Sequence, residues 1–522
     1  MQLNKVSLAE TRAFSPFFID YIQQKNTLTP FYHKFPTIEN FGDQIAEKSA
    51  SFSNNHREVL VKALKRQYET ISLSPEVEKN ILILEDPKTF TVTTGHQLNI
   101  FTGPLYFIFK IVTVINTCSK LKERYPDYNF VPVYWMASED HDYEEIKYFK
   151  LYGKKYVWET KQSGAVGRFL TDGLSALAKD VPGETSIFRE AYAKHKKLSA
   201  AVRHYVNALF AAQGLIVLDP DDRELKKEFS KVISQDVLLN SSKNVVDSTN
   251  SSLEGLGYKT QIFCRDINFF YLTEGLRSRI EKTNGKFNIL DSNLTFSEKE
   301  IETLIASEPE RFSPNVILRP LYQEMILPNL AYVGGPAEVI YWLQLKGVFD
   351  QFSVPFPMIM PRNFGMIVDH EVGRKLEKTG LNFTEIFEEK NYLFNHWVLK
   401  HSPRNLTVGQ ERAELDKIFE SLRERAESID TTLSRFVGAE GKRNLNSLEK
   451  IERKFLRAEK RLHADKLRQI EAVKDALFPN GSLQERTENF LNFYQRDPQF
   501  IQHLIENFDP FDFRFHILSY NS

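Results

Sequence analysis

Five apolar runs in the first 370 residues, each bounded by turn-forming residues, predict buried strands. They are TFTVTT (89–94), NFVPVYWMA (129–137), GLIVLDP (214–220), EMILPNLAYVGG (324–335) and FPMIMPR (356–362). Between the first two runs, residues 104–125 carry apolar side chains at helical spacing. A strand, a helix and a second strand in succession predict a crossover of a parallel sheet, so the fold class is α/β.

Shorter segments predict additions to this sheet. The first 85 residues are expected to be mostly helical. Two alternating segments are typical of hairpins: KYFKLYGKKYVWET (147–160), turning at Gly-Lys-Lys, and QIFCRDINFFYLT (261–273), alternating around DIN. We interpret them as parts of small antiparallel insertions, 147–200 and 240–310, in a doubly wound core spanning 1–370.

After residue 370 the apolar spacing changes to threes and fours, flanked by charged faces, which is typical of a coiled coil. A glycine-containing stretch, VGAEGKRN (437–444), separates two seams, so we predict a helical hairpin within 371–478. The seams are Leu415, Ile418, Leu422, Ala426, Ile429, Leu433, Phe436 and then Leu448, Ile451, Phe455, Ala458, Leu462. A closed hairpin and a homodimer interface would bury the same residues.

The C-terminal segment, 479–522, is expected to be helical and to pack back on the core. Pro479 and Gly481 stop the preceding helix, and Ser482 and Glu485 are spaced as a capping box for the next one.

Composition narrows the function classes. The net charge of -1 gives no general reason to expect a nucleic-acid or membrane partner. The two cysteines, Cys118 on the helix of 104–125 and Cys264 in a predicted strand, cannot form a disulfide framework and are expected to be buried structural thiols. The N-terminus has no secretory pattern, and no apolar stretch approaches ~20 residues, so we expect a cytoplasmic protein.

The stretch TTGHQLNIFTGPLYFIFK (93–110) joins the first strand to its helix and is the first candidate site. Ligands of α/β proteins bind beyond the carboxyl ends of strands. Here Thr102 could cap the helix, Gly103 would let backbone approach a ligand, and the helix start and Lys110 would suit a phosphate or carboxylate. The alternative is a plain strand-to-helix turn, since no standard nucleotide fingerprint is present.

The second candidate, WMASEDHDYEE (135–145), follows the next strand. His141 lies between two aspartates, Asp140 and Asp142, which would orient the imidazole and make it more basic, as in a general base. The acidic residues could instead be helix caps. A metal site shared by His96 and His141 is a further alternative.

The third candidate is LRPLYQEMILPNLAYVGGPAEVIYWLQLK (318–346), where Gly334 and Gly335 repeat the pattern of a strand, a glycine turn and a helix. Arg319, Tyr322 and Gln323 offer hydrogen-bond donors for a carboxylate. The alternative is a structural turn.

Four segments in this order along nearly the whole chain resemble the bacillithiol biosynthesis cysteine-adding enzyme family: TGHQLNIFTGPLYFIFK, VPVYWMASEDHDYEEI, YVGGPAEVIYWLQLK and ALFPNGSLQER. The resemblance implies a Rossmann-like core similar to class I aminoacyl-tRNA synthetases, with connecting-peptide insertions and a coiled-coil domain that forms a homodimer. It implies a cysteine ligase that joins cysteine to the amine of glucosaminyl malate, giving bacillithiol.

The resemblance also implies site roles. ATP with Mg²⁺ would activate the carboxyl, with His96 and Asn99 at the phosphates, and His141, backed by Asp140, would take the proton from the amine. The expected substrate-binding residues are Gln97, Thr102, Gly103, Tyr106, Lys110, Trp135, Arg319, Tyr322, Gln323, Gly334 and Gly335.

Other readings of the chain stay open. No KMSKS-type loop is evident, so the activated donor could be an adenylate, an acyl phosphate or the product of a partner protein. A metal-dependent hydrolase using His96 and His141, and a coiled-coil scaffold that senses a nucleotide, are the competing hypotheses.

Overall fold

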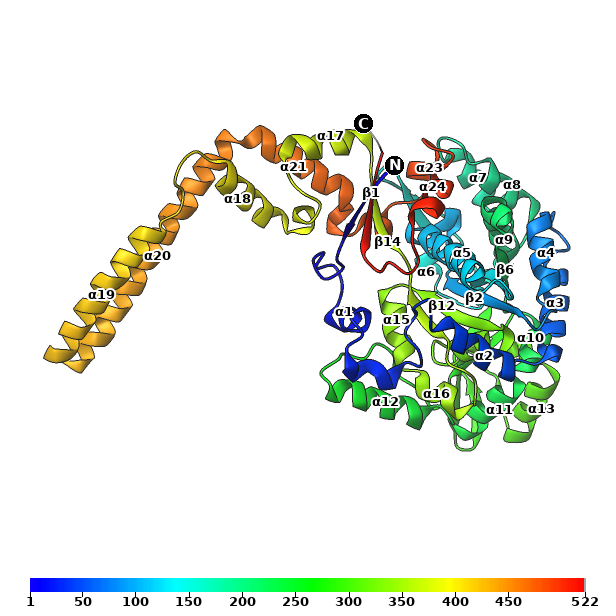
Figure 1. Cartoon of the computed structure of the whole chain (residues 1–522). Helices are drawn as coiled ribbons and strands as arrows, with labels where there is room; N and C mark the ends of the chain where they lie inside the picture. Colours follow the sequence, from blue (N-terminus) through cyan, green and yellow to red (C-terminus); the bar gives the residue numbers. More distant parts are fainter. Residues whose placement is uncertain (521–522) are drawn as a thin grey trace.

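Five parallel strands form the central sheet of this computed structural model, which describes residues 1–520 (Figure 1). In sheet order they are β13 (Met358–Pro361), β12 (Asn329–Gly334), β2 (Thr89–His96), β3 (Asn129–Met136) and β6 (Ile216–Leu218). All neighbouring strands are parallel. The predicted strands and the Rossmann-like core are therefore confirmed.

One strand boundary differs from the prediction. Glu324 lies in the last turn of helix α14 (Arg319–Ile326), and β12 begins only at Asn329. Pro320 in the first turn favours this helix, and Pro328 then separates it from the strand.

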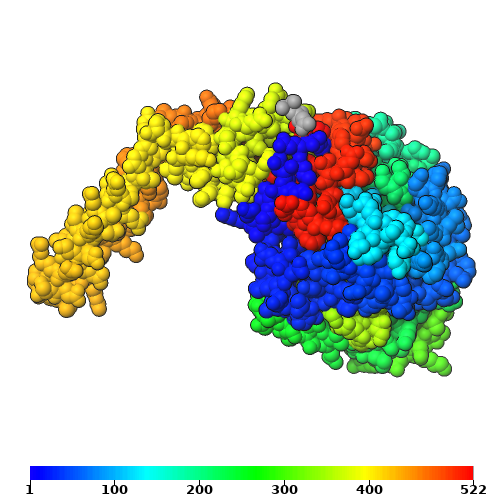
Figure 2. Space-filling model, in the orientation of Figure 1, coloured from blue at the N-terminus to red at the C-terminus, as the bar shows by residue number. Residues whose placement is uncertain are grey.

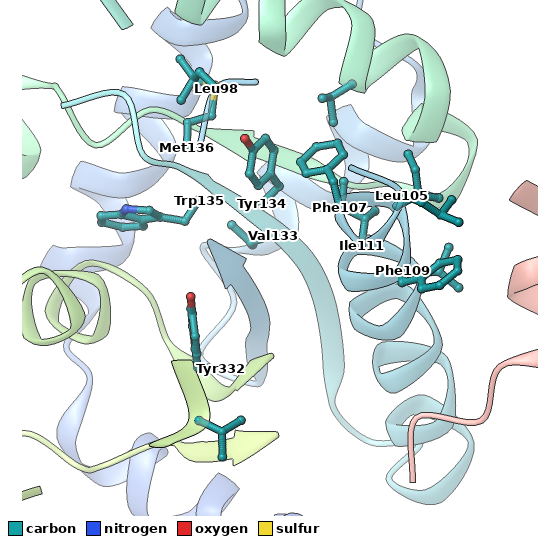
Figure 3. Close-up of a cluster of buried hydrophobic side chains, with 14 of the residues drawn as sticks. Leu98, Leu105, Phe107, Phe109, Ile111, Val133, Tyr134, Trp135, Met136 and Tyr332 are labelled. Carbon is teal, nitrogen blue, oxygen red and sulfur yellow. The ribbon is translucent and has the colours of Figure 1, made fainter. Parts of the chain in front are cut away.

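Helix α5 (Tyr106–Arg124) packs on β2 and β3 and is the predicted crossover helix. Successive side chains of β3 project to opposite sides, so Tyr134 meets Phe107 of α5 at 5.2 Å between ring centroids while Trp135 points away from α5 (Figure 3). Cys118 is buried on α5, which confirms its expected structural role, and burial raises the pKa of its thiol.

The N-terminal 85 residues are mostly helical, as predicted. The helices are α1 (Pro16–Ile22), α2 (Phe41–Ser51), α3 (Asn54–Tyr68) and α4 (Pro75–Ile83). The sequence did not predict strand β1 (Gln2–Val6), which precedes them.

The segment between β3 and β6 contains the predicted hairpin, formed by β4 (Tyr148–Leu151) and β5 (Lys154–Val157). The short helix α6 (Tyr143–Ile146) precedes it. Three helices follow: α7 (Leu174–Asp180), α8 (Ser186–Lys194) and α9 (Leu198–Phe210).

The segment between β6 and β12 holds a five-stranded antiparallel sheet in the order β10-β9-β8-β7-β11. Its strands are β7 (Phe269–Thr273), β8 (Leu276–Thr283), β9 (Lys286–Ile289), β10 (Thr295–Phe296) and β11 (Phe312–Pro314). Its helices are α10 (Arg223–Glu228), α11 (Ser230–Leu239), α12 (Lys243–Gly255) and α13 (Glu298–Ser307).

The hairpin predicted within 261–273 is wrong. Strand β7 pairs with β8 across a turn at Glu274 and Gly275, and Cys264 lies outside any strand and is half-buried. The residues before β7 do not pair as a strand, and the backbone N–H of Asn268 donates instead to the buried side chain of Asp236 at 2.6 Å.

Two long antiparallel helices form an arm that extends away from the core (Figures 1 and 2). They are α19 (Gly409–Ile429) and α20 (Thr431–Leu462), which confirms the helical hairpin. Three helices join the arm to the core: α17 (His370–Thr379), α18 (Lys390–His401) and α21 (Ala464–Leu477).

The predicted break at 437–444 is wrong, because α20 continues through it and the chain turns at Asp430 instead. Asp430 caps α20 by accepting from the backbone N–H of Thr432 at 2.8 Å. Gly441 serves packing here, since a Cβ at this position would lie 3.0 Å from the Phe419 side chain of α19.

The chain ends lie together where the arm leaves the core. Strand β15 (Phe515–Ser519) pairs antiparallel with β1 and parallel with β14 (Phe364–Val368). The segment before β15 contains α22 (Gln484–Thr487), α23 (Leu491–Tyr494) and α24 (Phe500–Asn507), and α24 packs on α5. The sequence predicted helices here but not the strand.

The predicted capping box is also wrong. Leu483 precedes α22, and no side chain caps this helix. Glu485 instead forms a buried bidentate pair with Arg362, at 3.0 and 2.5 Å, and accepts from the backbone N–H of Gly365 at 2.9 Å.

Across residues 1–520, no helix is both long and apolar enough to cross a membrane.

Candidate functional site

A pocket of about 510 Å³ lies at the carboxyl edge of the parallel sheet, and we call it the main pocket. Its wall includes Gly95 and His96 at the end of β2, and Trp135 at the end of β3. Gly335 and helix α15 (Pro336–Leu343) follow β12 on the opposite side. This is the position at which open α/β sheets bind ligands.

The turn after β2 has an unusual backbone. Phe101, Thr102 and Gly103 all have positive φ, at 51°, 68° and 62°. The Asn489 side chain holds the turn by donating to the carbonyls of Phe101 and Gly103, at 2.7 and 2.6 Å. Positive φ at non-glycine residues costs about 1–3 kcal/mol each, so the surrounding contacts must offset this strain.

Thr102 does not cap α5, which corrects our prediction. Its side chain is buried without a hydrogen-bond partner among the described residues, and Leu105 is the residue that precedes the helix. The backbone N–H of Leu105 donates to the carbonyl of Glu488 at 2.7 Å, so this donor is already used. The start of α5 is therefore tied to the C-terminal segment.

Lys110, which is buried, and Glu338, whose side chain is 24% exposed, form an ion pair in the wall of the main pocket. Lys110 also donates to the Gly95 carbonyl at 2.8 Å. Glu338 accepts from the Tyr332 hydroxyl at 2.5 Å and from the Gly335 N–H at 2.8 Å. Burial would raise the pKa of Glu338, but Lys110 holds it below its usual value. The lysine thus neutralises a local carboxylate instead of being free for a ligand.

Arg319 presents an unpaired cation to the main pocket. Its guanidinium donates to the Tyr341 hydroxyl at 2.8 Å and lies over the Tyr332 ring, and none of the carboxylates of residues 1–520 forms an ion pair with it. Burial would lower its pKa, but the neighbouring Tyr341, Tyr332 and Glu338 raise it above the usual value. A half-buried arginine without an anion is a natural partner for a carboxylate or phosphate.

Two further arginines extend the cationic side. Arg362, which follows β13, is paired with Glu485 and lies over the Tyr106 ring at 5.1 Å. Arg486, on α22, is exposed at the pocket wall. The C-terminal segment therefore contributes one of the pocket cations.

His96 is a neutral imidazole in the wall of the main pocket. Burial, reinforced by the positive charge of Lys110, lowers its pKa to about 3. Its Nε2 is buried and has no hydrogen-bond partner within the described part of the chain. Because a neutral imidazole can donate one hydrogen bond, His96 can serve an oxygen atom of a ligand.

The opposite side of the main pocket is acidic. Gln97 donates to Asp140 at 2.5 Å, and Glu145 reaches the pocket from α6. Burial would raise the pKa of Asp140, but Arg277 and the hydrogen bond from Gln97 hold it below its usual value. A ligand in the pocket therefore lies between cations and carboxylates.

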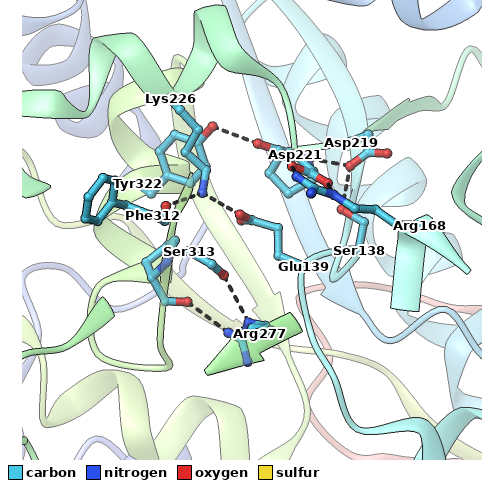
Figure 4. Close-up of polar contacts among 12 residues, drawn as sticks. Ser138, Glu139, Arg168, Asp219, Asp221, Lys226, Arg277, Phe312, Ser313 and Tyr322 are labelled. Carbon is cyan, nitrogen blue, oxygen red and sulfur yellow. Dashed lines mark hydrogen bonds and ion pairs between the residues drawn. The ribbon is translucent and has the colours of Figure 1, made fainter. Parts of the chain in front are cut away.

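Glu139 anchors this acidic side to the inserted sheet (Figure 4). It is buried and paired with Lys226 of α10, which also donates to the Phe312 carbonyl at 2.8 Å. Beside it, Arg168 forms a bidentate pair with Asp221, at 2.7 and 2.8 Å. These contacts fix the loop after β3 against both inserted segments.

Arg277, on β8, brings the inserted sheet into the site (Figure 4). Its guanidinium donates to Ser313 at 3.1 Å, stacks on Phe270 and lies 3.7 Å from Asp140. It also donates to His141 Nδ1 at 2.5 Å, and burial together with this arginine lowers the pKa of His141. The Nδ1 lone pair of His141 is thus occupied, and His141 does not line the main pocket.

A side cavity of about 230 Å³ opens between the turn after β2, the hairpin of β4 and β5, and α22. It shares wall residues with the main pocket, and among them are His96, Gln97 and Glu145. Asn99 and Gly103, predicted as site residues, line this cavity.

The structure brings most predicted site residues to these two cavities but leaves five outside. His96, Gln97, Tyr106, Lys110, Trp135, Asp140, Arg319 and Gly335 line the main pocket. The five that line neither cavity are Thr102, His141, Tyr322, Gln323 and Gly334. Tyr322 and Gln323 are buried on α14, and the Tyr322 hydroxyl donates to the Pro220 carbonyl at 2.9 Å. Of the three residues expected to donate hydrogen bonds to a substrate carboxylate, only Arg319 therefore reaches the pocket.

Sequence reasoning missed Arg277, Arg362, Glu145 and Arg486 as pocket residues. Glu145 belongs to the acidic stretch of the second candidate site, and Arg362 ends the last apolar run. The position of both residues beyond a predicted strand was therefore a signal that could have identified them. No local pattern pointed to Arg277, whereas Arg486 ends the segment ALFPNGSLQER that carried the family resemblance. Among residues 1–520, no group of three or more His, Cys, Asp or Glu side chains is placed to hold a metal ion.

Comparison with known proteins gives a consistent result over the whole chain. Residues 1–363 match the family model "Bacillithiol biosynthesis BshC, N-terminal Rossmann-like domain", and residues 365–520 match "Bacillithiol biosynthesis BshC, C-terminal coiled-coil domain".

Three relatives carry the name "Putative cysteine ligase BshC". The protein from Flavobacterium psychrophilum is 42% identical over 506 residues, covering 95% of each chain. The protein from Christiangramia forsetii is 40% identical and covers 100% of this chain and 99% of its own. The protein from Cytophaga hutchinsonii is 40% identical and covers 99% of each. The chain belongs to the BshC family of bacillithiol biosynthesis.

Proposed function

We propose that this protein is the cysteine ligase that joins the carboxyl of cysteine to the amine of glucosaminyl malate, giving bacillithiol in the cytoplasm. A carboxylate does not condense with an amine unaided in water, so the reaction requires an activated carboxyl. We propose that ATP supplies this activation.

The observation that carries the proposal is the charge arrangement of the main pocket. Arg319 faces it without an anionic partner among residues 1–520, while Asp140 and Glu145 line the opposite side. Amide ligation needs a site that holds a carboxylate next to an amine, and a pocket of about 510 Å³ with opposed charges has the size and the chemistry for both.

Each group of residues then has a role in binding. Arg319, steadied by the Tyr341 hydroxyl, holds the cysteine carboxylate. His96 is neutral at physiological pH, and its Nε2 donates to an anionic oxygen that gains charge during the transfer. Lys110 acts through Glu338, since their ion pair holds the end of β2 against α15.

The charged lining of the pocket also supports our proposal that it binds a nucleotide with magnesium. ATP would supply the phosphate leaving group, and Arg319 and Arg486, neither of which pairs with a carboxylate within residues 1–520, offer positive charge for its phosphates. Magnesium bound with a nucleotide takes one or two carboxylates beside phosphate oxygens. Glu139 and Glu338 are each paired with a lysine, which leaves Asp140 and Glu145. We assign this contact to Asp140, whose carboxylate Gln97 already orients.

We also propose that the arm forms a homodimer. Several apolar seam residues remain exposed in the single chain, although α19 and α20 already pack on one another. The exposed fraction is 55% for Ile418, 63% for Phe436 and 48% for Phe455. A row of large apolar side chains on a long helical hairpin is the surface that a second hairpin would cover.

Substitution of Arg319 tests the proposed carboxylate contact. The Arg319→Leu variant is expected to raise the KM for cysteine at least about tenfold, because a charged hydrogen bond contributes about 1.5–3 kcal/mol. Arg223→Leu is the matched control, since Arg223 lies on the exposed part of α10 and lines neither cavity. Unchanged cysteine kinetics in Arg319→Leu would contradict the assignment.

A further inference from the structure

The side cavity contains two buried hydrogen-bond acceptors that the protein itself leaves unused. Gln97 Oε1 and Asn99 Oδ1 have no partner within residues 1–520. Their amide orientations are fixed, because Gln97 Nε2 donates to Asp140 and Asn99 Nδ2 donates to the Glu145 carbonyl at 2.8 Å. A buried acceptor without a partner costs about 1–3 kcal/mol, so these oxygens suit a ligand rich in N–H or O–H donors.

Glu145 stands at the junction of the side cavity and the main pocket, and it lines both. Its side-chain carboxylate takes part in none of the ion pairs or hydrogen bonds of the described chain; only its backbone carbonyl does, with Asn99. The residue is exposed, so a substrate can reach it. An amine bound between the two cavities would therefore meet a free carboxylate.

The charged groups around Glu145 favour a carboxyl that takes up a proton readily. Asp140 and Asp142 are its acidic neighbours, and together with partial burial, which is the larger cause, they raise its pKa. The other titratable residues of the side-cavity wall are His96, Tyr106, Tyr148, Lys150 and Arg486. A carboxylate with a raised pKa is a better proton acceptor at neutral pH than an ordinary one.

The wall of the side cavity also contains two cationic side chains. Lys150 on β4 and Arg486 on α22 line it, and neither forms an ion pair within 1–520. The cavity thus offers acceptors for an amine and hydroxyl groups next to cations for carboxylates. This combination matches an amino sugar that carries a dicarboxylic acid.

We propose that the side cavity binds the hydroxyl-rich, carboxylate-bearing amine substrate and that Glu145 takes the proton that the amine loses. The nitrogen lone pair forms the new C–N bond to the activated cysteine carboxyl, the C–O bond to the phosphate leaving group breaks with its electron pair, and the N–H proton passes to the Glu145 carboxylate. This assignment rests on the proposed ligase function. It gives the proton-accepting role to Glu145 and leaves His141, which Arg277 occupies, outside the reaction.

Proton acceptance by Glu145 and substrate binding in the side cavity predict different kinetic effects. Glu145→Gln keeps the size of the side chain but removes its basicity, so kcat is expected to fall about 100-fold or more and the acidic limb of the pH–rate profile to disappear. Lys150→Gln is expected to raise the KM for glucosaminyl malate about tenfold with little change in kcat, because it removes only a binding contact.

Glu144→Gln is the matched control for the first variant. Glu144 neighbours Glu145 on α6, but its side chain is exposed, pairs with Lys147 and lines neither cavity. The control is expected to keep the wild-type rate and pH profile. Thermal melting of all three variants shows whether each is folded.

A second measurement separates this proposal from the ligase function itself. Calorimetric titration of glucosaminyl malate into wild-type protein and into Asn99→Leu tests the cavity without turnover. The proposal predicts at least tenfold weaker binding to Asn99→Leu. If the wild type makes no product but this difference holds, the ligase function fails and the binding site stands. Equal binding, or a Glu145→Gln variant with wild-type kcat and pH profile, would overturn the proposal.

Discussion

Removing the amine of Lys110 measures how much the ion pair with Glu338 contributes to the free energy of unfolding. In Lys110→Met, Glu338, which is about three-quarters buried, would lose its counter-charge, and the Gly95 carbonyl would lose its donor. Breaking a buried pair by removing one partner costs about 3–5 kcal/mol. Because Tyr332 and Gly335 still donate to Glu338, we expect a loss near the lower end, about 3 kcal/mol.

The pH dependence of this loss gives its cause. Lys110 holds the pKa of Glu338 below its usual value, and without the lysine, burial raises that pKa. At low pH the variant can protonate Glu338, and the uncompensated charge disappears. The loss of unfolding free energy should therefore be larger at pH 8 than at pH 5.

Urea unfolding at both pH values measures this loss, with two further variants for comparison. Adding Glu338→Gln to Lys110→Met should recover part of the stability, because the double variant buries no unpaired charge. Lys346→Met removes a surface pair with Asp350 and should cost less than about 1 kcal/mol. A loss in Lys110→Met below about 1 kcal/mol, or one that does not change with pH, would refute the reasoning.

Three other predictions follow from separate parts of the molecule. Gly103→Ala should lower the unfolding free energy in the urea assay by about 2 kcal/mol or more, because φ is 62° and the new Cβ would lie 2.6 Å from Asn99 Cβ. Gly153→Ala, where φ is also positive but the space is open, should lower it less. Burial lowers the pKa of His516 to about 4, so this imidazole binds a proton more readily in the unfolded chain, and the unfolding free energy should fall by about 2 kcal/mol as pH drops from 6.5 to 5. A His516→Phe variant whose unfolding free energy falls equally steeply over this range would contradict this. Ile418→Glu combined with Phe436→Glu should convert the proposed homodimer to monomers in analytical ultracentrifugation, whereas Glu440→Gln on the same arm should not.

The sequence predicted the parallel core well because each strand carries its own signal. The five apolar runs and the helix of 104–125 are local patterns, and the register of side chains along β3 follows from strand geometry alone. The arm was predicted for the same reason. Its turn was misplaced, because Gly441 resembles a break but provides close packing against Phe419.

The missed features depend on contacts between distant segments. Strand β15 joins β1 from the other end of the chain, and Glu485 leaves the predicted cap to pair with Arg362. The site shows the same division. Residues at or shortly after the ends of strands, such as His96 and Asp140, could be found from the sequence, whereas Arg277 reaches the pocket from an inserted sheet. Burial also makes His96 neutral, which the sequence could not reveal.

The most direct test of the proposed function is reconstitution of the whole reaction. Purified protein would be incubated with ATP, magnesium, cysteine and glucosaminyl malate, and the thiol product and nucleotides would be followed by mass spectrometry. The account predicts bacillithiol together with one equivalent of AMP or ADP, only when both substrates are present, and loss of product in Glu145→Gln but not in Glu144→Gln. Absence of product from folded wild-type protein that binds both substrates, or product formed without ATP, would contradict ATP-dependent ligation by this chain alone.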